Sequence, residues 1–465
     1  MKAFVFIDHD IICRHFVQSG ALLPLSRAAQ VTYVFPEEGG KRFSLDPEAL
    51  PLGASWLRLP VDAVRMQIWR WVLFADQLKL RPGGHERSLR RFRRRSLGWK
   101  ASLLLTIAGF PGIEILFRRW IMSRLGEHPN PALADLLDRE RPDVVIHPSV
   151  LDGSFINDLV EECAKRGIPT VIVMNSWDNP STKRAVVGQP DWLLVWGPQT
   201  RDHAMRFVGM RPERTLAFGA AQFDVFRTPP RFDRDELCRR YGFDPARPLV
   251  LFAGANTQTD EFATMRALDD AVSSGTLPPL NLLYRPHPWG GAGAGGERFF
   301  GHSFAHVRID STMREIVERV ARGDKAAITL PVYRDAHDLL AAVDIVVSPL
   351  STIVVEAALH AKPVICFFPA EKDETSRNIN AVPLYHFEEF FAVPDVAVAR
   401  DVEGLRSALR DLASPAEAAV RGARLRVDVQ RFVTPFDEPW GDRFVAFLEE
   451  RIQGRSDIAK GHGSG

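Results

Sequence analysis

Three short polar segments in the second half of the sequence each follow an apolar run: 254–259 (Gly-Ala-Asn-Thr-Gln-Thr), 285–290 (Arg-Pro-His-Pro-Trp-Gly) and 348–352 (Ser-Pro-Leu-Ser-Thr). Small residues in the first segment let backbone amides approach an anion closely. The second segment offers a guanidinium and an imidazole, and the third offers hydroxyls at the start of a predicted helix. Such groups bind phosphate. The candidate phosphate ligands are Gly254, Asn256, Thr257, Arg285, His287, Ser351 and Thr352.

The helix predicted at 353–361 would begin directly after Ser351 and Thr352 and would contain Glu356. Hydroxyls and free amides would then converge at the positive end of the helix dipole. The alternative is that Ser351 only caps its own helix. For His287, which lies between two prolines, the alternative is a structural role in a loop. The occurrence of three such segments in one half of the chain favours binding.

The His-Pro pair at 287–288 and the Ser-Thr pair followed by Glu356 resemble GT-B glycosyltransferases of bacterial envelope synthesis. Similar patterns occur in CDP-glycerol glycerophosphotransferases, in bacterial sialyl- and polysialyltransferases, and in Kdo transferases of capsule export systems. The resemblance implies that His287, Ser351 and Thr352 contact the donor phosphates and that Glu356 lies near the donor ribose.

The same resemblance implies a CMP-, CDP- or UDP-linked sugar as donor and a lipid-linked or growing glycan as acceptor. It implies no cofactor and no metal, because GT-B enzymes typically bind the donor without a catalytic metal. The UDP-N-acetylglucosamine 2-epimerases share this fold and much of its Ser-x-x-x-Glu pattern. An epimerase and a non-catalytic nucleotide-sugar-binding subunit therefore stay as alternatives.

A transfer that inverts the sugar needs a general base for the acceptor hydroxyl, and we expect it in the first half of the chain. The segment 175–183 (Asn-Ser-Trp-Asp-Asn-Pro-Ser-Thr-Lys) corresponds to the Trp-His-Gly-Thr-Pro segment of the glycerophosphotransferases. Here Asp178 replaces the histidine, so we assign catalysis to Asp178 together with His287. An Asx-type turn is the alternative for Asp178. The neighbouring acceptor-side candidates are Trp177, Asn179 and Lys183.

Two other acidic segments compete for the role of base. Glu37-Glu38-Gly39 resembles the acidic motif of bacterial sialyltransferases, although its early position favours a solvated turn. The second segment, Asp8-His9-Asp10 with Arg14-His15, follows the first predicted strand. In it, Asp10 and His15 are candidates for contact with the acceptor, and helix capping is the alternative for Asp10.

Short β-branched runs alternate with helical patterns along the whole chain, which is typical of parallel sheets covered by helices. We therefore predict an α/β protein with two Rossmann-like, doubly wound domains that face a cleft, as in GT-B proteins. Ligands of such open sheets bind beyond the carboxyl ends of the strands, where the three polar segments fall. Strands are predicted at 2–7, 31–35, 55–59, 143–147, 170–175, 192–196, 215–218, 249–253, 282–284, 307–309, 326–329, 344–347 and 364–367.

The predicted domains are 1–226 on the acceptor side and 233–438 on the nucleotide side, joined by a segment with Pro229-Pro230. A helix at 439–456 is expected to return to the first domain, and 457–465 reads as a flexible tail.

An insert at about 81–126 of the first domain combines charge with hydrophobicity. Its first part, 81–100, carries eight basic residues against Glu86, and apolar runs follow it. This combination suits a helix pair on anionic lipid, with a solvated basic helix followed by buried core helices as the alternative.

Composition limits the remaining classes of function. The chain has 59 Lys and Arg against 58 Asp and Glu and lacks a basic platform with interleaved aromatic residues, which argues against nucleic acid as a partner. Its four widely spaced cysteines predict reduced, mostly buried thiols. Neither a signal peptide nor a membrane-spanning run is recognisable, so we expect a cytoplasmic protein, with peripheral contact to the inner membrane as an option.

Overall fold

The computed structural model describes most of the 465 residues. The described residues are 1–37, 50–51, 53–78, 99–100, 103–104, 106–107, 110, 112–151, 153–182, 186, 188–254, 260–287, 298–299, 301–321, 332–369 and 384–453. The chain divides into two compact units, the first made of 1–225 with 431–465 and the second of 226–430. The chain rejoins the first unit at residue 431, whereas the sequence predicts the return at residue 439. The tail at 457–465 and the strand predicted at 326–329 lie outside the described residues.

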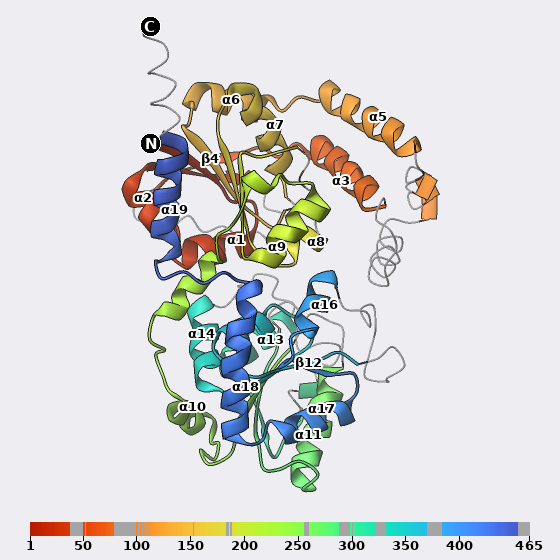
Figure 1. Ribbon diagram of the computed structural model, residues 1–465, viewed down its shortest axis with the longest axis vertical. Helices are drawn as coiled ribbons and strands as arrows, with labels where there is room; N and C mark the ends of the chain where they lie inside the picture. Colours follow the sequence, from red (N-terminus) through yellow and green to blue (C-terminus); the bar gives the residue numbers. More distant parts are fainter. Residues whose placement is uncertain are drawn as a thin grey trace. The chain divides into compact units, whose positions relative to one another are not determined.

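The first unit contains a seven-stranded parallel sheet with the order β3-β2-β1-β4-β5-β6-β7 (Figure 1). Its order reverses between β1 and β4, which makes that junction the switch point of a doubly wound sheet. The strands coincide closely with the sequence prediction. They are β1 (Lys2–Phe6), β2 (Gln30–Pro36), β3 (Ser55–Leu59), β4 (Val144–Ser149), β5 (Thr170–Met174), β6 (Trp192–Val195) and β7 (Thr215–Ala217).

Apolar side chains cover both faces of this sheet, as expected for buried parallel strands. In β1, Val5 belongs to one core cluster, together with Leu25 of α2 and Phe444 of α19. Phe4 points into the opposite cluster, with Leu133 of α6 and Leu159 of α7. The helices of this unit are α1 (Asp10–Ile12), α2 (Leu23–Ala28), α3 (Ala63–Leu78), α5 (Ile113–Glu127), α6 (Pro131–Glu140), α7 (Ile156–Arg166), α8 (Asn179–Thr182), α9 (Pro198–His203) and α19 (Trp440–Leu448).

The C-terminal segment completes the core of the first unit. The ring of Trp440, which is 1% exposed, meets Phe218 edge to face at a centroid distance of 5.7 Å. A Cβ placed on Gly441 would lie 2.6 Å from the carbonyl oxygen of Ala21. The helix α19 therefore packs against backbone at a position where only glycine fits.

The second unit contains a six-stranded parallel sheet with the order β10-β9-β8-β11-β12-β13. Its switch point lies between β8 and β11. Five of its strands match the sequence prediction, and β13 is an addition to it. The strands are β8 (Leu249–Ala253), β9 (Asn281–Arg285), β10 (Val307–Ile309), β11 (Ile345–Ser348), β12 (Val364–Phe367) and β13 (Ala397–Ala399).

Local sequence signals set the helix ends of this unit. The helix α10 begins after Asp233, whose carboxylate accepts a hydrogen bond from Glu236 N, and it ends at Gly242 in the left-handed region (φ 66°). The helices are α10 (Arg234–Tyr241), α11 (Glu261–Ser273), α13 (Ser311–Ala321), α14 (Tyr333–Ala342), α15 (Ile353–Leu359), α16 (Tyr385–Phe391), α17 (Val402–Asp411) and α18 (Pro415–Asp428).

Candidate active site

The three polar segments of the second unit follow three adjacent strands, β9, β8 and β11, and so lie at the switch point. Ala253 pairs with Arg285, and Phe252 pairs with Val347, so the carboxyl ends of these strands are level. Gly254 N donates to the carbonyl of Arg285 (2.9 Å), and Ser348 Oγ donates to the carbonyl of Ala253 (2.8 Å). The structure thus brings together, at one edge of one sheet, the described residues of these segments, 254, 285–287 and 348–352.

The start of α15 keeps its side-chain hydroxyl away from the helix amides. Thr352 is the N-cap residue and makes no side-chain capping hydrogen bond. Ser351 and Thr352 are half-buried, and their carbonyls accept from Val354 N (3.3 Å) and Val355 N (3.0 Å). The N-cap residue is Thr352 and not Ser351, so the alternative that Ser351 caps the helix does not hold. The positive end of the helix dipole lies at this edge of the sheet.

Arg285 has a structural partner in place of the open cation that the sequence suggests. Its side chain is 10% exposed, and Nη1 lies 2.6 Å from Oδ2 of the buried Asp310 at the end of β10. The second oxygen, Asp310 Oδ1, accepts from Thr312 N (3.0 Å). The charge of Arg285 is therefore already balanced inside the unit. The ion pair joins the ends of β9 and β10, and a contact of Arg285 with a phosphate stays a prediction.

Two buried carboxylates lie beside these loops. Glu356, the candidate ribose ligand, is 8% exposed and accepts from the hydroxyl of Tyr333 (2.6 Å). Glu261, which our reading of the sequence misses, accepts from the hydroxyl of Tyr284 (2.5 Å). Burial and this carboxylate raise the pKa of Tyr284 well above its usual value. A Cβ at Gly254 would lie 2.5 Å from Glu261 Oε2, so a side chain there would displace the carboxylate.

The remaining donor-side candidates divide into described and undescribed positions. His287 is described and half-buried, two residues after the end of β9. Asn256, Thr257 and the acceptor-side candidate Lys183 lie outside the described residues.

The loop that carries Asp178 is built as a turn into α8. The Asp178 carbonyl accepts from Thr182 N (2.9 Å), and Asp178 Oδ2 accepts from Thr182 Oγ1 (3.0 Å). Asn179 Oδ1 accepts from Ser176 N (2.8 Å), and Asn179 is 3% exposed. The turn alternative accounts for these bonds, while the half-buried carboxylate of Asp178 keeps its place as a candidate base.

Trp177, an acceptor-side candidate, is a core residue in the structure. It is 1% exposed, and its ring meets Phe432 edge to face at 5.7 Å. Asn179, inside the same turn, is equally inaccessible. Both side chains anchor the strand-to-helix turn in the core, and their contact with an acceptor stays a prediction.

The switch point of the first unit holds an internal acid–imidazole pair that we did not predict. Asp8 follows β1 and His147 belongs to β4, and Asp8 Oδ2 lies 3.3 Å from His147 Nε2 with both side chains at most 1% exposed. The same oxygen accepts from Ser154 N (2.9 Å). Burial alone would raise the pKa of Asp8, but the His147 imidazole and the Ser154 amide outweigh burial and lower it. The pair joins the ends of two strands and is too deeply buried to contact a substrate.

His15 and Asp10 are the acceptor-side candidates near this switch point. His15 is 7% exposed, and its Nδ1 donates to Asn175 Oδ1 at the end of β5 (2.7 Å). Asp10 Oδ1 accepts from Ile11 N (2.8 Å) and lies 2.6 Å from His9 Nδ1. The N-cap residue of α1 is His9, whose Nδ1 accepts from Ile11 N (3.2 Å), so Asp10 is the first residue of the helix and not its cap. His15 lies inside the unit, and a contact of either residue with the acceptor stays a prediction.

Within the part of the chain that the structure describes, no group of three or more His, Cys, Asp or Glu side chains could hold a metal ion. The four cysteines are free and buried, as the sequence predicts. Burial raises the pKa of Cys163 to about 12, so this thiol is unreactive at neutral pH.

We compared the chain with known protein families and solved structures. No family model matches the sequence, and no curated protein matches it. Solved structures do match over nearly the whole chain. A UDP-N-acetylglucosamine 2-epimerase has 13% identity and a TM-score of 0.52, covering 98% of both chains. MnaA of S. aureus, solved with UDP, has 10% identity and a TM-score of 0.53, covering 96% of both chains.

A third similar structure is the glycotransferase of kitacinnamycin, with 14% identity, a TM-score of 0.51 and coverage of 97% of this chain and 98% of that chain. Together with the two parallel, doubly wound sheets, these matches decide the fold. The chain has the GT-B fold. At 10–14% identity the likeness concerns the fold and leaves the reaction open.

Proposed function

We propose that this chain is a nucleotide-sugar-dependent glycosyltransferase that moves a sugar, or a sugar-like group, onto a lipid-linked or growing envelope glycan. The observation that carries the proposal is the start of α15 at the switch point of the second sheet. There Thr352 makes no side-chain cap, and β8, β9 and β11 end level at the same edge of the sheet. This is the arrangement in which α/β proteins bind a nucleotide phosphate.

In this proposal the departing nucleotide phosphate is stabilised by fixed dipoles. The positive end of the α15 dipole and the hydroxyls of Ser351 and Thr352 stabilise the phosphates, and His287 adds a hydrogen-bond donor from the β9 side. Preorganised donors at the site of developing charge account for a large part of such catalysis. Asp178 is our candidate for the base that takes the acceptor proton. The reaction as proposed uses no metal.

The group of glycosyltransferases that this chain resembles and the nucleotide of its donor are part of the same proposal. The His-Pro and Ser-Thr patterns favour relatives that use CMP-, CDP- or UDP-linked donors, and the cytoplasm supplies such donors. A thermal-shift screen of the full chain against CMP, CDP, UDP, GDP and their sugars identifies the nucleotide, because a ligand of the folded state raises the melting temperature by mass action.

The test of the site uses His287→Ala with His306→Ala as its matched control. His306 lies in the same unit but directly precedes β10, at the amino edge of the sheet. We expect His287→Ala to lower donor hydrolysis and transfer by about 100-fold or more, since a positioned proton donor contributes that much. The melting temperature should change little, and His306→Ala should keep full activity.

Full activity of His287→Ala with the donor found in the screen would remove this residue from the site. A donor that is converted without any acceptor, as monitored by NMR of a UDP-N-acetylhexosamine with enzyme alone, would identify an epimerase. Binding without turnover in the presence of lipid-linked acceptor would identify a non-catalytic subunit.

A further inference from the structure

The helix α5 of the first unit exposes large apolar side chains that a core helix would bury. Leu116 is 65% exposed, Trp120 59% and Ile113 44%, whereas Ile121 and Leu125 on the opposite side are at most 3% exposed. Leu104, Ile107 and Phe110, which precede α5, are also exposed. A surface helix that is apolar on both sides needs a second apolar neighbour. The interpretation of this region as buried core helices is therefore wrong.

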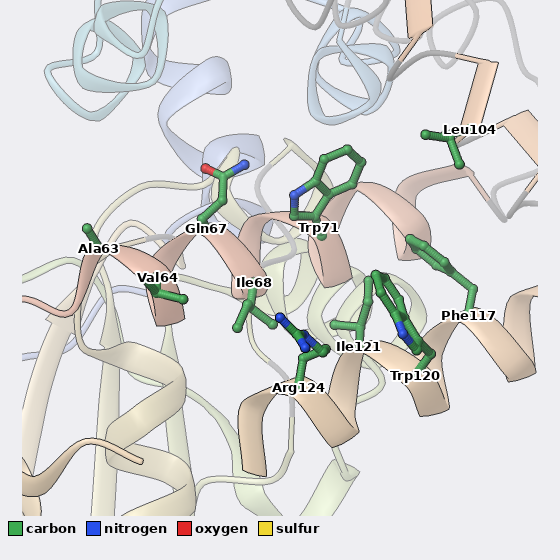
Figure 2. Close-up of a pocket in the computed structure, with 10 residues that line it drawn as sticks. All are labelled: Ala63, Val64, Gln67, Ile68, Trp71, Leu104, Phe117, Trp120, Ile121 and Arg124. Atoms are coloured by element: carbon green, nitrogen blue, oxygen red, sulfur yellow. The ribbon is translucent and has the colours of Figure 1, made fainter. Parts of the chain in front are cut away.

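An apolar groove runs between α5 and α3. It has a volume of about 520 Å³, and carbon atoms form nearly all of its wall. Figure 2 shows Phe117, Trp120 and Ile121 pointing from α5 toward α3, with Ile68 pointing back from α3. A groove of this width and chemistry accommodates a hydrocarbon chain better than any polar ligand.

A buried ion pair fixes this helix pair to the rest of the unit. Arg65 of α3 and Asp158 of α7 are each 3% exposed and lie 2.8 Å apart, Nη2 to Oδ1. Arg65 Nη1 also donates to the carbonyl of Leu125 near the end of α5 (3.1 Å), and Trp69 Nε1 donates to Asp158 Oδ1 (2.7 Å). The apolar surface is thus presented by a rigid support, as a docking surface requires.

The charge around the surface is positive. Arg119 and Arg124 of α5 and Lys100 are exposed, and Arg124 is partnered by Glu127 at 2.8 Å. Among the described residues, no helix is long and apolar enough to cross a membrane. Cations beside exposed apolar residues on a helix are typical of binding parallel to an anionic bilayer.

We infer that the α3–α5 surface docks onto an anionic lipid bilayer, with the hydrocarbon chain of one lipid in the groove between the two helices. Charge decides between this occupant and a second copy of the chain. Two copies joined through this surface would bring two sets of cations together, whereas an anionic bilayer neutralises them. The inference does not depend on the proposed transferase activity, and it is tested without any nucleotide sugar.

The test measures co-sedimentation of the full chain with vesicles of phosphatidylcholine alone and of phosphatidylcholine with 30% phosphatidylglycerol. We expect binding to the anionic vesicles and its loss at high salt. Leu116→Glu should weaken binding by about tenfold or more, because burial of one leucine side chain contributes that much. Arg119→Gln should weaken it by about fivefold. The matched control is Val427→Glu in α18, where the valine is 63% exposed in the other unit.

Occupation of the groove is measured separately with lipids brominated along the acyl chain, which quench nearby tryptophans. We expect the brominated lipids to quench the tryptophan fluorescence of the wild type. The quenched fraction should be smaller in Trp120→Phe, because Trp120 lies at the groove. Equal binding of Leu116→Glu and Val427→Glu would overturn the inference. So would a lipid-independent dimer, detected by light scattering, that Leu116→Glu dissociates. Circular dichroism of each variant separates loss of docking from loss of folding.

Discussion

At the scale of single residues, His15 shows how a candidate ligand becomes part of the protein interior. Its imidazole donates to Asn175 Oδ1, and Asn175 in turn donates its backbone N–H to the carbonyl of Ser149 (2.8 Å). These contacts connect the segment after β1 with the ends of β4 and β5. Burial, followed by the charge of Arg14, lowers the pKa of His15 to about 3. His15 is therefore neutral in the folded protein at neutral pH.

This shifted pKa predicts a loss of stability in acid. The unfolded chain binds a proton at His15 below about pH 6.5, and the folded chain does not do so until about pH 3. The contribution of neutral His15 to the free energy of unfolding is thus fully present above pH 6.5, and it is lost progressively as the pH falls. Between pH 6.5 and 4.5 we expect a loss of roughly 2–3 kcal/mol from this group.

Urea denaturation of the wild type and of His15→Gln at pH 7.5 and pH 4.5 measures this effect. The variant should be less stable at pH 7.5 but should lose less on acidification, since glutamine does not titrate. His360, whose pKa burial lowers to about 4, supplies acid sensitivity common to both proteins. If the two proteins lost the same free energy of unfolding between pH 7.5 and pH 4.5, the lowered pKa of His15 would be contradicted.

At the scale of elements, the helices of the second unit begin in two different ways. Asp401 caps α17 by accepting from Gly404 N (2.7 Å), and Asp260 caps α11 by accepting from Ala263 N (3.0 Å). The helix α15 begins without such a bond from Thr352. The helix α18 also begins without a side-chain cap, from Ser414, so the missing cap alone does not identify a ligand site, and the phosphate role of Thr352 needs its own test.

This difference predicts opposite effects for two matched substitutions. Thr352→Ala should leave the melting temperature of the free protein nearly unchanged and should weaken nucleotide binding by about tenfold, the contribution of one hydrogen bond to a charged group. Asp401→Ala should lower the melting temperature by about 2–4 °C, as expected for about 1 kcal/mol in a unit of this size, and should keep nucleotide binding. Thermal shift with and without the nucleotide measures both. Equal nucleotide affinity of Thr352→Ala and wild type would exclude the phosphate role.

At the scale of the whole molecule, the chain leaves the first unit, builds the second and returns to complete the first. The returning α19 supplies Trp440, Phe444 and Phe447 to the core cluster that also contains Val5 and Phe218. The first unit therefore lacks part of its core until the last residues of the chain are in place.

Close packing of α19 predicts the effect of one added methyl group. Gly441→Ala would place its Cβ against the carbonyl of Ala21 and the ring of Pro24, so we expect a loss of about 1–3 kcal/mol from overpacking. Gly126→Ala in α5 is the matched control, because a Cβ there meets no atom within 4 Å. It should stabilise the helix slightly. Chemical denaturation followed by tryptophan fluorescence measures both. A Gly441→Ala protein as stable as wild type would show that α19 is not tightly docked.

The sequence by itself determined the elements. Alternating apolar runs, proline and glycine breaks and capping residues are local signals, so the strands 55–59, 249–253 and 364–367 and the start of α10 could be predicted where they occur. The sequence also indicated which segments lie at the carboxyl ends of strands, because parallel strands all end at the same edge.

Only the tertiary structure decided which side chains meet at that edge. His147 and Asp8 are 139 residues apart, and they become neighbours because β4 lies beside β1 in the sheet. Arg285 finds Asp310 because β10 pairs with β9. Burial is equally non-local: Trp177 is buried in the core although its neighbours in the sequence are polar, whereas Trp120, next to Ile121 and Met122, is exposed. Partners and exposure depend on strand order and packing across the sheet, which no local pattern encodes.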